Sequence, residues 1–151
     1  MATRKSARSV EPAEVEPAEV ELEEIEENEE SELTLEDCQQ LRDMLLTKRD
    51  EVVAALQKHM AEAMDDNENL PDEMDLAERQ SRQAYLFRLA DKDQKLLREI
   101  DHALTKFSRG TYGICEGTGD PIGLKRLRLR PWTRYSIEYK EMLERERNGR
   151  R

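Results

Sequence analysis

The feature that most constrains the fold is a regular apolar spacing between positions 86 and 107. Successive members lie four and three residues apart in strict alternation, and one of them is polar. The series is Leu86, Ala90, Asp93, Leu97, Ile100, Leu104 and Phe107. Such a spacing keeps one face of a helix against a partner helix, as in a coiled coil. Gly110 follows the series and predicts the end of this helix.

A second, earlier pattern supplies the partner helix. Its apolar residues lie three, four or seven positions apart: Leu35, Cys38, Leu41, Leu45, Val52, Leu56, Met60 and Ala63. Thr34, with Asp37 three residues later, predicts the start of this helix through a capping box. Each helix has about thirty residues and is therefore on the order of 45 Å long. The short connection between the two helices predicts that they pack antiparallel.

The sequence thus predicts a predominantly all-α fold built on a long antiparallel coiled-coil hairpin over residues 34–109. Only 36% of the residues are apolar and 5% aromatic, which favours an elongated protein over one with a large globular core. Residues 1–33 contain twelve Glu and the repeat Glu-Pro-Ala-Glu-Val, which begins at positions 11 and 16. This composition predicts a disordered acidic arm, whose simplest function is solubility.

The turn of the hairpin, near residues 65–77, is strongly acidic. From His59 to Glu78 there are eight carboxylates and no Lys or Arg. Most charge runs are only solvated surfaces. This run lies where the hairpin turns, so it places Asp72 and Asp75 at the far end of a rigid arm. We therefore predict an acidic tip that reaches into a partner molecule.

Residues 110–136 belong to a segment with the spacing of a zinc site but without most of its ligands. Four positions have the C-x-x-C…C-x-x-C spacing of zinc ribbons and fingers. They are occupied by Cys115, Thr118, Ser136 and Tyr139. Because one thiolate cannot hold a tetrahedral zinc ion, we predict no metal and no other cofactor. We expect packing to hold the segment together, with Tyr139 filling the space of the absent ion.

The last predicted element lies within residues 137–151 and consists of a helix followed by a basic tail. Ser136 is expected to cap this helix. Met142 and Leu143 are expected to pack on the base of the hairpin. Ten Lys or Arg and four Glu lie between positions 121 and 151, so this end of the chain is opposite in charge to the tip.

Over residues 34–145 the sequence resembles the DksA/TraR family of bacterial transcription regulators. Asp72, Asp75 and Ala77 match the Asp-x-x-Asp-x-Ala motif of the family's tip. Cys115 matches its first zinc ligand, and the Arg-Pro pair at positions 130 and 131 matches the segment before the second ligand pair. The resemblance implies a cytoplasmic protein that binds bacterial RNA polymerase and inserts its tip into the secondary channel to modulate initiation. It implies no enzymatic activity.

The family also responds to the alarmone ppGpp through basic side chains. The resemblance assigns two of these positions to Arg130 and Lys140, while the helical position falls on Glu99. A carboxylate at that position repels a polyphosphate. We therefore expect ppGpp sensitivity to be weak or absent, and ordinary surface basicity is the alternative role of the two cations.

Other functions remain open at this point. A coiled-coil transcript-cleavage factor would use the same channel, and an adaptor or homodimeric coiled coil would use the hairpin for association. A small nucleic-acid-binding module would use a basic cluster with two aromatic residues: Lys125, Arg126, Arg128, Arg130, Arg134, Trp132 and Tyr135. The net charge of −10 opposes sequence-specific DNA binding. We expect the protein to be a monomer.

The two cysteines, and the lack of an apolar segment that could span a membrane, favour a reducing, cytoplasmic setting. The hairpin geometry could bring Cys38 and Cys115 near each other. Buried free thiols are the default expectation, and a regulatory disulfide is the alternative. His59 and His102 are expected to be helix-surface or packing residues.

Overall fold

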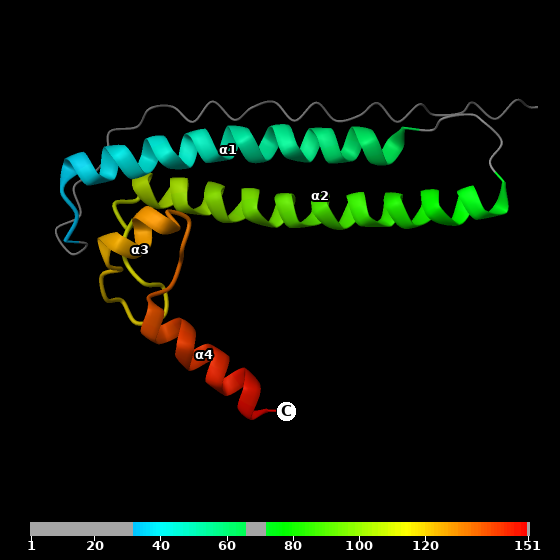
Figure 1. The fold of residues 1–151 in the computed structure, drawn as a ribbon. Coiled ribbons are helices and arrows are strands. Elements are labelled where there is room, and N and C mark those ends of the chain that lie inside the picture. Colours follow the sequence, from blue (N-terminus) through cyan, green and yellow to red (C-terminus); the bar gives the residue numbers. More distant parts are fainter. Residues whose placement is uncertain (1–31, 66–71, 151) are drawn as a thin grey trace, which may run out of the picture.

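The computed structural model describes residues 32–65 and 72–150, and this part of the chain is predominantly helical (Figure 1). Two long helices, α1 (Leu35–Met64) and α2 (Glu73–Ser108), lie side by side and antiparallel. A short helix α3 (Leu124–Leu129) and a terminal helix α4 (Ile137–Gly149) follow at the base of the hairpin. The predicted all-α fold with a long hairpin is confirmed. Most of the predicted acidic arm lies outside the described residues.

The ends of the two long helices are set by local sequence. The hydroxyl of Thr34 accepts the backbone N–H of Asp37 at 3.2 Å, and the Asp37 carboxylate accepts the backbone N–H of Thr34 at 3.4 Å. This is the predicted capping box. At the end of α2, Gly110 has a φ of 63°. The N–H of Thr111 donates to the carbonyl of Lys106 at 3.0 Å, which completes a Schellman-type helix end.

The hairpin seam follows the predicted spacing at most positions. Its fully or nearly fully buried members near the base are Cys38, Leu41, Leu45, Val52, Ile100, Leu104 and Phe107. The prediction for Leu35 is wrong: it is 43% exposed in the first turn of α1, and Leu33, just before the cap, packs against the core instead. Towards the tip the seam thins to Ala63, Leu86 and Ala90, which lie outside the main cluster.

The polar position predicted in the seam has a partner on the opposite helix. Asp93 Oδ2 lies 2.8 Å from His59 Nδ1, and both side chains are about four-fifths buried. The expected role of His59 as a surface or packing residue is therefore replaced by a cross-hairpin hydrogen bond. A polar pair inside an apolar seam fixes the register of the two helices.

Residues between α2 and α4 have no separate core, because their buried side chains join the base of the hairpin. Tyr112, Ile122 and Leu127 are at most 4% exposed and belong to the same cluster as the seam residues. The Tyr112 ring stacks on Phe107 at 3.8 Å between centroids, and its hydroxyl donates to the carbonyl of Pro131 at 2.8 Å. The finger-like segment is thus fastened to the last turns of α2.

Helix α4 leaves the base at an angle and does not follow the hairpin (Figure 1). None of its residues is buried, and Met142 is 44% exposed. The expectation that Met142 and Leu143 pack on the hairpin base is wrong for Met142, while Leu143 is half-buried but does not belong to the core. The physical reason is composition, since charged residues surround these two positions and leave too little apolar surface to bury.

In the parts of the chain that the structure describes, no helix combines the length and apolar composition needed to cross a membrane.

Candidate functional site

The predicted acidic tip residues lie at the start of α2, at the end of the molecule farthest from α3 (Figure 1). The N–H of Leu76 donates to the carbonyl of Asp72 at 3.0 Å, so the helix begins directly after Asp72. Asp72, Asp75 and Ala77 are all exposed. Carboxylates in the first turn of a helix are favoured by the helix dipole. Residues 66–71, which belong to the predicted tip, lie outside the described residues.

The tip also exposes apolar side chains that sequence reasoning missed. Met74 is 82% exposed, Leu76 43% and Met64 66%. Large exposed apolar side chains beside charged residues are typical of interaction surfaces. The tip can therefore offer a partner apolar contact as well as negative charge. The sequence carried a signal for this surface, because Met74 and Leu76 stand between the acidic residues of the predicted tip.

The first half of the finger-like segment is a tight loop around Cys115. An isolated bridge pairs Ile114 with Pro121, and the N–H of Cys115 donates to the carbonyl of Asp120 at 2.8 Å. The loop closes at Gly119, whose φ of 80° is in the left-handed region. Its N–H returns to the carbonyl of Cys115 at 2.9 Å. Within this loop the backbone N–H groups of Gly117 and Thr118 hydrogen-bond to the Cys115 sulfur.

The Cys115 side chain is 1% exposed and is held by hydrogen-bond donors. Its sulfur accepts the backbone N–H of Ser136 at 3.3 Å. Burial raises the pKa of the Cys115 thiol, but the donors from Ser136, Thr118 and Gly117 outweigh it and lower the pKa to about 6. These donors therefore favour the thiolate form of the sulfur. Both cysteines are free and buried, which confirms the default expectation.

A charged cluster around Glu116 links the two halves of the segment to α2. Arg134 donates to Glu116 Oε2 through two nitrogens, at 2.8 Å and 2.7 Å. His102 Nε2 lies 2.5 Å from Glu116 Oε1, and Lys106 Nζ lies 3.6 Å from the same oxygen. The Lys106 ammonium also donates to the carbonyl of Ile114 at 2.9 Å. No spacing motif in the sequence marks this cluster, and the prediction for His102 did not include it.

The environment of Glu116 keeps this side chain ionised. Partial burial raises its pKa, but hydrogen bonds from Arg134 and His102 and the charge of Lys106 lower the pKa to about 2. Burial in turn lowers the pKa of Lys106, which is only 9% exposed. The backbone adds a further link, because the N–H of Glu116 donates to the carbonyl of Arg134 at 3.0 Å. The Glu116 carboxylate thus connects the loop around Cys115 to α2 and to the segment that contains Arg134.

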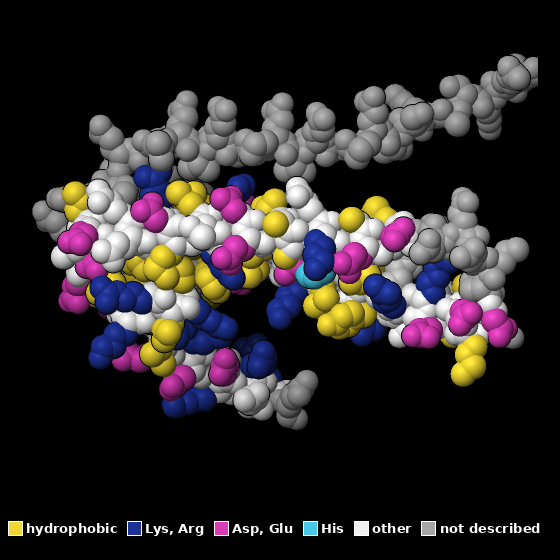
Figure 2. Space-filling view, turned by 45° about the horizontal axis from the view of Figure 1, so that its top comes forward, with side chains coloured by type: hydrophobic (Ala, Val, Ile, Leu, Met, Phe, Trp, Pro, Cys, Tyr) yellow, Lys and Arg dark blue, Asp and Glu magenta, His cyan; other side chains and the backbone are white. Residues whose placement is uncertain are grey.

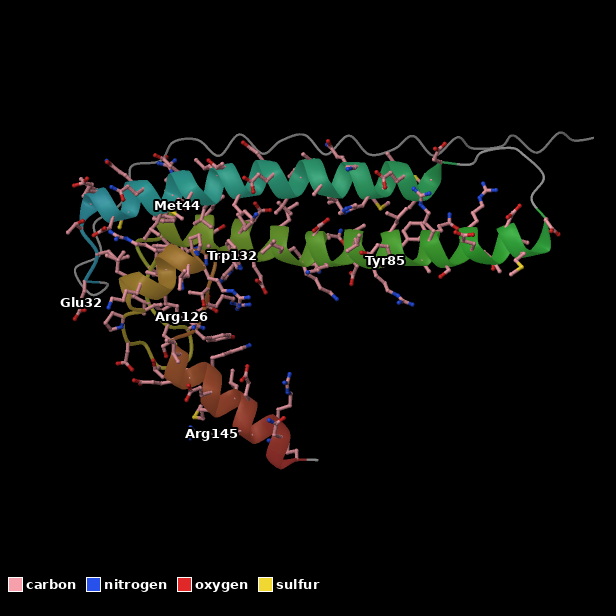
Figure 3. All side chains as sticks on the ribbon, in the orientation of Figure 1. Glu32, Met44, Tyr85, Arg126, Trp132 and Arg145 are labelled. Carbon is pink, nitrogen blue, oxygen red and sulfur yellow. The ribbon has the colours of Figure 1, made fainter. Side chains whose placement is uncertain are left out.

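A basic pocket lies between the base of α2, the loop after α3 and the start of α4. Its volume is about 140 Å³, and Arg126 and Trp132 face it between α2 and α4 (Figure 3). The lining residues are Glu99, Arg126, Arg130, Trp132, Thr133, Arg134, Tyr135 and Lys140. The structure therefore brings together Arg130, Lys140 and Glu99. Among the described residues the side chains of Arg130 and Lys140 have no ion pair or hydrogen bond.

The wider basic cluster of the sequence is divided by the fold. Arg128 turns towards α1, where its Nη2 lies 3.3 Å from Asp37 Oδ1. Lys125 lines a different hollow, together with Asp120 and Glu138. Figure 2 shows Lys and Arg over the finger-like segment, side chains of both charges over α4, and Asp and Glu at the free end of α2. Among the described residues, this division separates the cations of the sequence cluster, whereas a continuous groove of positive charge is what tracks a nucleic-acid backbone.

Two family descriptions match the chain. The N-terminal domain of the DnaK suppressor protein DksA matches residues 37–107, and the prokaryotic dksA/traR C4-type zinc finger matches residues 110–138. The RNA polymerase-binding transcription factor DksA of Caulobacter vibrioides is 36% identical over 104 residues, which are 69% of this chain and 73% of that protein. The chain belongs to the DksA/TraR family. The Escherichia coli protein of the same name is 29% identical over 103 residues, 68% of each chain.

A solved structure agrees with this assignment. Transcription factor DksA2 from Pseudomonas aeruginosa superposes with a TM-score of 0.68 at 40% identity, over 76% of this chain and 88% of that one. Within the DksA/TraR family the departure of this chain is its finger, where the matching description names four cysteines and only Cys115 is present.

The residues at the four ligand positions of this DksA/TraR member do not fit a zinc ion. The Ser136 hydroxyl accepts the N–H of Tyr139 at 3.4 Å and caps α4, as predicted. The Tyr139 ring lies over Gly117, where even a methyl side chain would overlap it, and packs against the core beside Tyr135. Across the described ranges, no group of three or more His, Cys, Asp or Glu could hold a metal ion. An aromatic ring at the fourth ligand position thus packs over Gly117.

The Glu116 cluster predicts a specific pH dependence of stability. We expect Glu116→Gln to lower the free energy of unfolding by about 1–2 kcal/mol at neutral pH, because charge-assisted hydrogen bonds are lost. A lowered carboxyl pKa stabilises the fold fully above its ordinary value of 4.5, and this contribution disappears as the pH falls towards about 2. Urea unfolding at a series of pH values measures the difference between the two proteins.

The matched control is Glu144→Gln, which removes an exposed carboxylate on α4. Its unfolding free energy is expected to follow that of the wild type at every pH. Equal stability of Glu116→Gln and Glu144→Gln would contradict the proposed role of the cluster, as would a difference from the wild type that does not shrink below pH 4.5.

Proposed function

We propose that this protein binds bacterial RNA polymerase in the cytoplasm as a monomer and modulates transcription initiation by inserting its acidic tip into the secondary channel. The observation that carries the proposal is the position of Asp72 and Asp75, exposed at the free end of a two-helix arm. Helix α1 alone has thirty residues and is therefore on the order of 45 Å long. The printed names of the relatives, RNA polymerase-binding transcription factors, support the same partner.

In the proposed mechanism, the tip acts inside the channel, while the shaft and base of the hairpin supply most of the contact with polymerase. A narrow pore lined by cations attracts a carboxylate-bearing rod and strengthens its interactions as water is excluded. There Asp75 competes for Arg and Lys side chains or for Mg²⁺, which prefers carboxylate oxygens. Ala77, on the same turn, keeps the helix slim enough for close approach, and the exposed Met74 contributes apolar contact. The protein changes the stability of promoter complexes and catalyses no reaction of its own.

The tip is tested by Asp75→Asn, which keeps the size of the side chain and removes its charge. We expect binding to polymerase to change little, because the shaft and base supply most of the contact area. The effect on a sensitive promoter is expected to fall by about tenfold, corresponding to roughly 1.4 kcal/mol. In vitro transcription and a polymerase-binding assay, run on the same preparations, measure the two quantities separately.

The control is Asp50→Asn, an exposed carboxylate on the shaft of α1. It should regulate as the wild type does. A tip variant with full regulatory output, or a wild-type protein that does not bind polymerase, would rule the proposal out.

For the basic pocket, we propose weak ppGpp binding. Arg130 and Lys140 can contact phosphate groups, but Glu99 lines the same pocket and repels them. Arg134 is already engaged by Glu116, so its charge is partly compensated. The pocket thus contains cations that attract a polyphosphate and one carboxylate that repels it.

Reversing the charge at Glu99 tests whether this carboxylate weakens ppGpp binding. We expect Glu99→Lys to raise the affinity of the polymerase complex for ppGpp by about tenfold or more. The affinity of Glu99→Gln is expected to lie between those of Glu99→Lys and the wild type. Binding of labelled ppGpp to the complex measures the affinity. Strong ppGpp synergy in the wild-type protein, or no change in Glu99→Lys, would show that Glu99 does not set the response.

We further propose that the finger-like segment is stabilised by packing and not by zinc. Metal analysis of the purified protein is expected to find far less than one zinc per chain, and a chelator should not change the melting temperature. Tyr139→Ala is expected to lower the free energy of unfolding by about 2 kcal/mol, because a half-buried aromatic ring is lost. The control Tyr85→Ala removes a tyrosine that is 59% exposed and should be nearly neutral. Stoichiometric zinc would overturn this proposal.

A further inference from the structure

The basic pocket has uncompensated positive charge. Four cationic side chains line it, and Glu99 is the carboxylate among its lining residues. Arg126 donates its Nε to the carbonyl of Tyr135 at 3.0 Å, which orients the guanidinium without neutralising it. The side chains of Arg130 and Lys140 have no ion pair in the described part of the chain. By comparison, shaft cations such as Lys95 pair with a carboxylate one helical turn away, at 2.7 Å from Asp91.

The same chain carries a dense run of the opposite charge. Between positions 11 and 30 there are eleven Glu and no Lys or Arg. Apolar residues recur within this run, including Val15, Val20 and Ile25. It therefore offers both carboxylates for the guanidinium groups and aliphatic side chains for the aromatic wall formed by Trp132 and Tyr135.

The acidic run is attached at the same end of the molecule as the pocket. Glu32, the first described residue, lies at the base of the molecule, at the same end as Arg126 and Trp132 (Figure 3). Leu33 packs against the core, and the ion pair between Asp37 and Arg128 joins this end of α1 to α3. A random coil of about twenty residues has a root-mean-square end-to-end distance of roughly 25 Å. Such a tether gives an effective concentration on the order of millimolar, so weak individual contacts suffice.

We propose that the acidic run, residues 11–30, docks in the basic pocket of its own chain. Its carboxylates pair with Arg130 and Lys140 and cover Trp132. The docked run therefore competes with any anionic ligand for the pocket, because such a ligand reaches the pocket only by displacing the run. Because the contact is electrostatic and lies at the surface, salt weakens it. The inference concerns the chain alone and does not depend on binding to polymerase.

The only tryptophan of the chain, Trp132, reports on the contact directly. Quenching of its fluorescence by acrylamide, a neutral probe, is compared in low salt for the full-length wild type and for a variant with charge-neutralised arm. The variant carries Glu→Gln at seven positions: Glu21, Glu23, Glu24, Glu26, Glu27, Glu29 and Glu30. We expect the quenching constant to rise by about twofold in the variant, and in the wild type at ~0.5 M salt, where the Debye length falls to a few ångströms.

Pocket variants test the other side of the contact. Arg130→Gln combined with Lys140→Gln should make Trp132 as accessible as the neutralised arm does, without an additive effect when the two sets are combined. Arg147→Gln is the control, because Arg147 is on α4 but does not line the pocket. It should leave quenching unchanged. Equal quenching in the wild type, the neutralised-arm variant and the pocket variant, at both salt concentrations, would overturn the proposal.

Zero-length cross-linking between carboxyl and amino groups locates the contact. The proposal expects cross-links from Lys140 to glutamates of the run in monomeric protein at low salt, and their loss at high salt. Cross-links that join the run to shaft lysines such as Lys92, with none to Lys140, would contradict it. Cross-links found only in a dimer band would also contradict it, because the run would then occupy another copy. Both measurements use purified protein, so their failure is distinct from a failure of the polymerase proposal.

Discussion

The apolar seam between α1 and α2 is the interaction on which every other part of this molecule depends. Leu45 and Ile100 are completely buried in it, and the finger-like segment adds Ile122 and Leu127 to the same cluster instead of forming a core of its own. The seam is widest at the base and thins to small residues such as Ala63 and Ala90 towards the tip. The base therefore has the packing that fixes the geometry, and the free end remains slim.

Loss of zinc ligands changes what holds the finger together. A metal ion would tie positions 115 and 118 to positions 136 and 139 through one centre. Here the Cys115 thiolate binds backbone N–H groups, Tyr139 fills space over Gly117, and Glu116 connects the loop to Arg134 and to α2. Several weaker links thus connect the two halves of the finger, and the strongest charged one depends on the ionisation of Glu116. The Glu116 link also reaches the hairpin, through His102 and Lys106 of α2.

Sequence reasoning succeeded where structure is local and periodic. The alternation of four and three residues located the α2 seam, the pair Thr34 and Asp37 located the start of α1, and Gly110 marked the end of α2. It failed where non-helical segments cross: the cluster around Glu116 brings together residues from α2 and from both halves of the finger, which no spacing rule connects. For the same reason the sequence grouped Arg128 with Arg126, although the fold turns them to different partners.

The distribution of charge connects the tip with the acidic run. A tip that enters a cationic channel must compete with every other anionic segment of its own chain, and residues 11–30 carry more carboxylates than the stretch from His59 to Glu78. An undocked run of this charge, tethered at Glu32, would be drawn to the same cationic surfaces of a partner. Docking in the pocket formed by Arg130 and Lys140 holds that charge at the base, on the far side of the arm from Asp75. Docking therefore places the two acidic regions of the chain, the run and the free end of α2, at opposite ends of the hairpin.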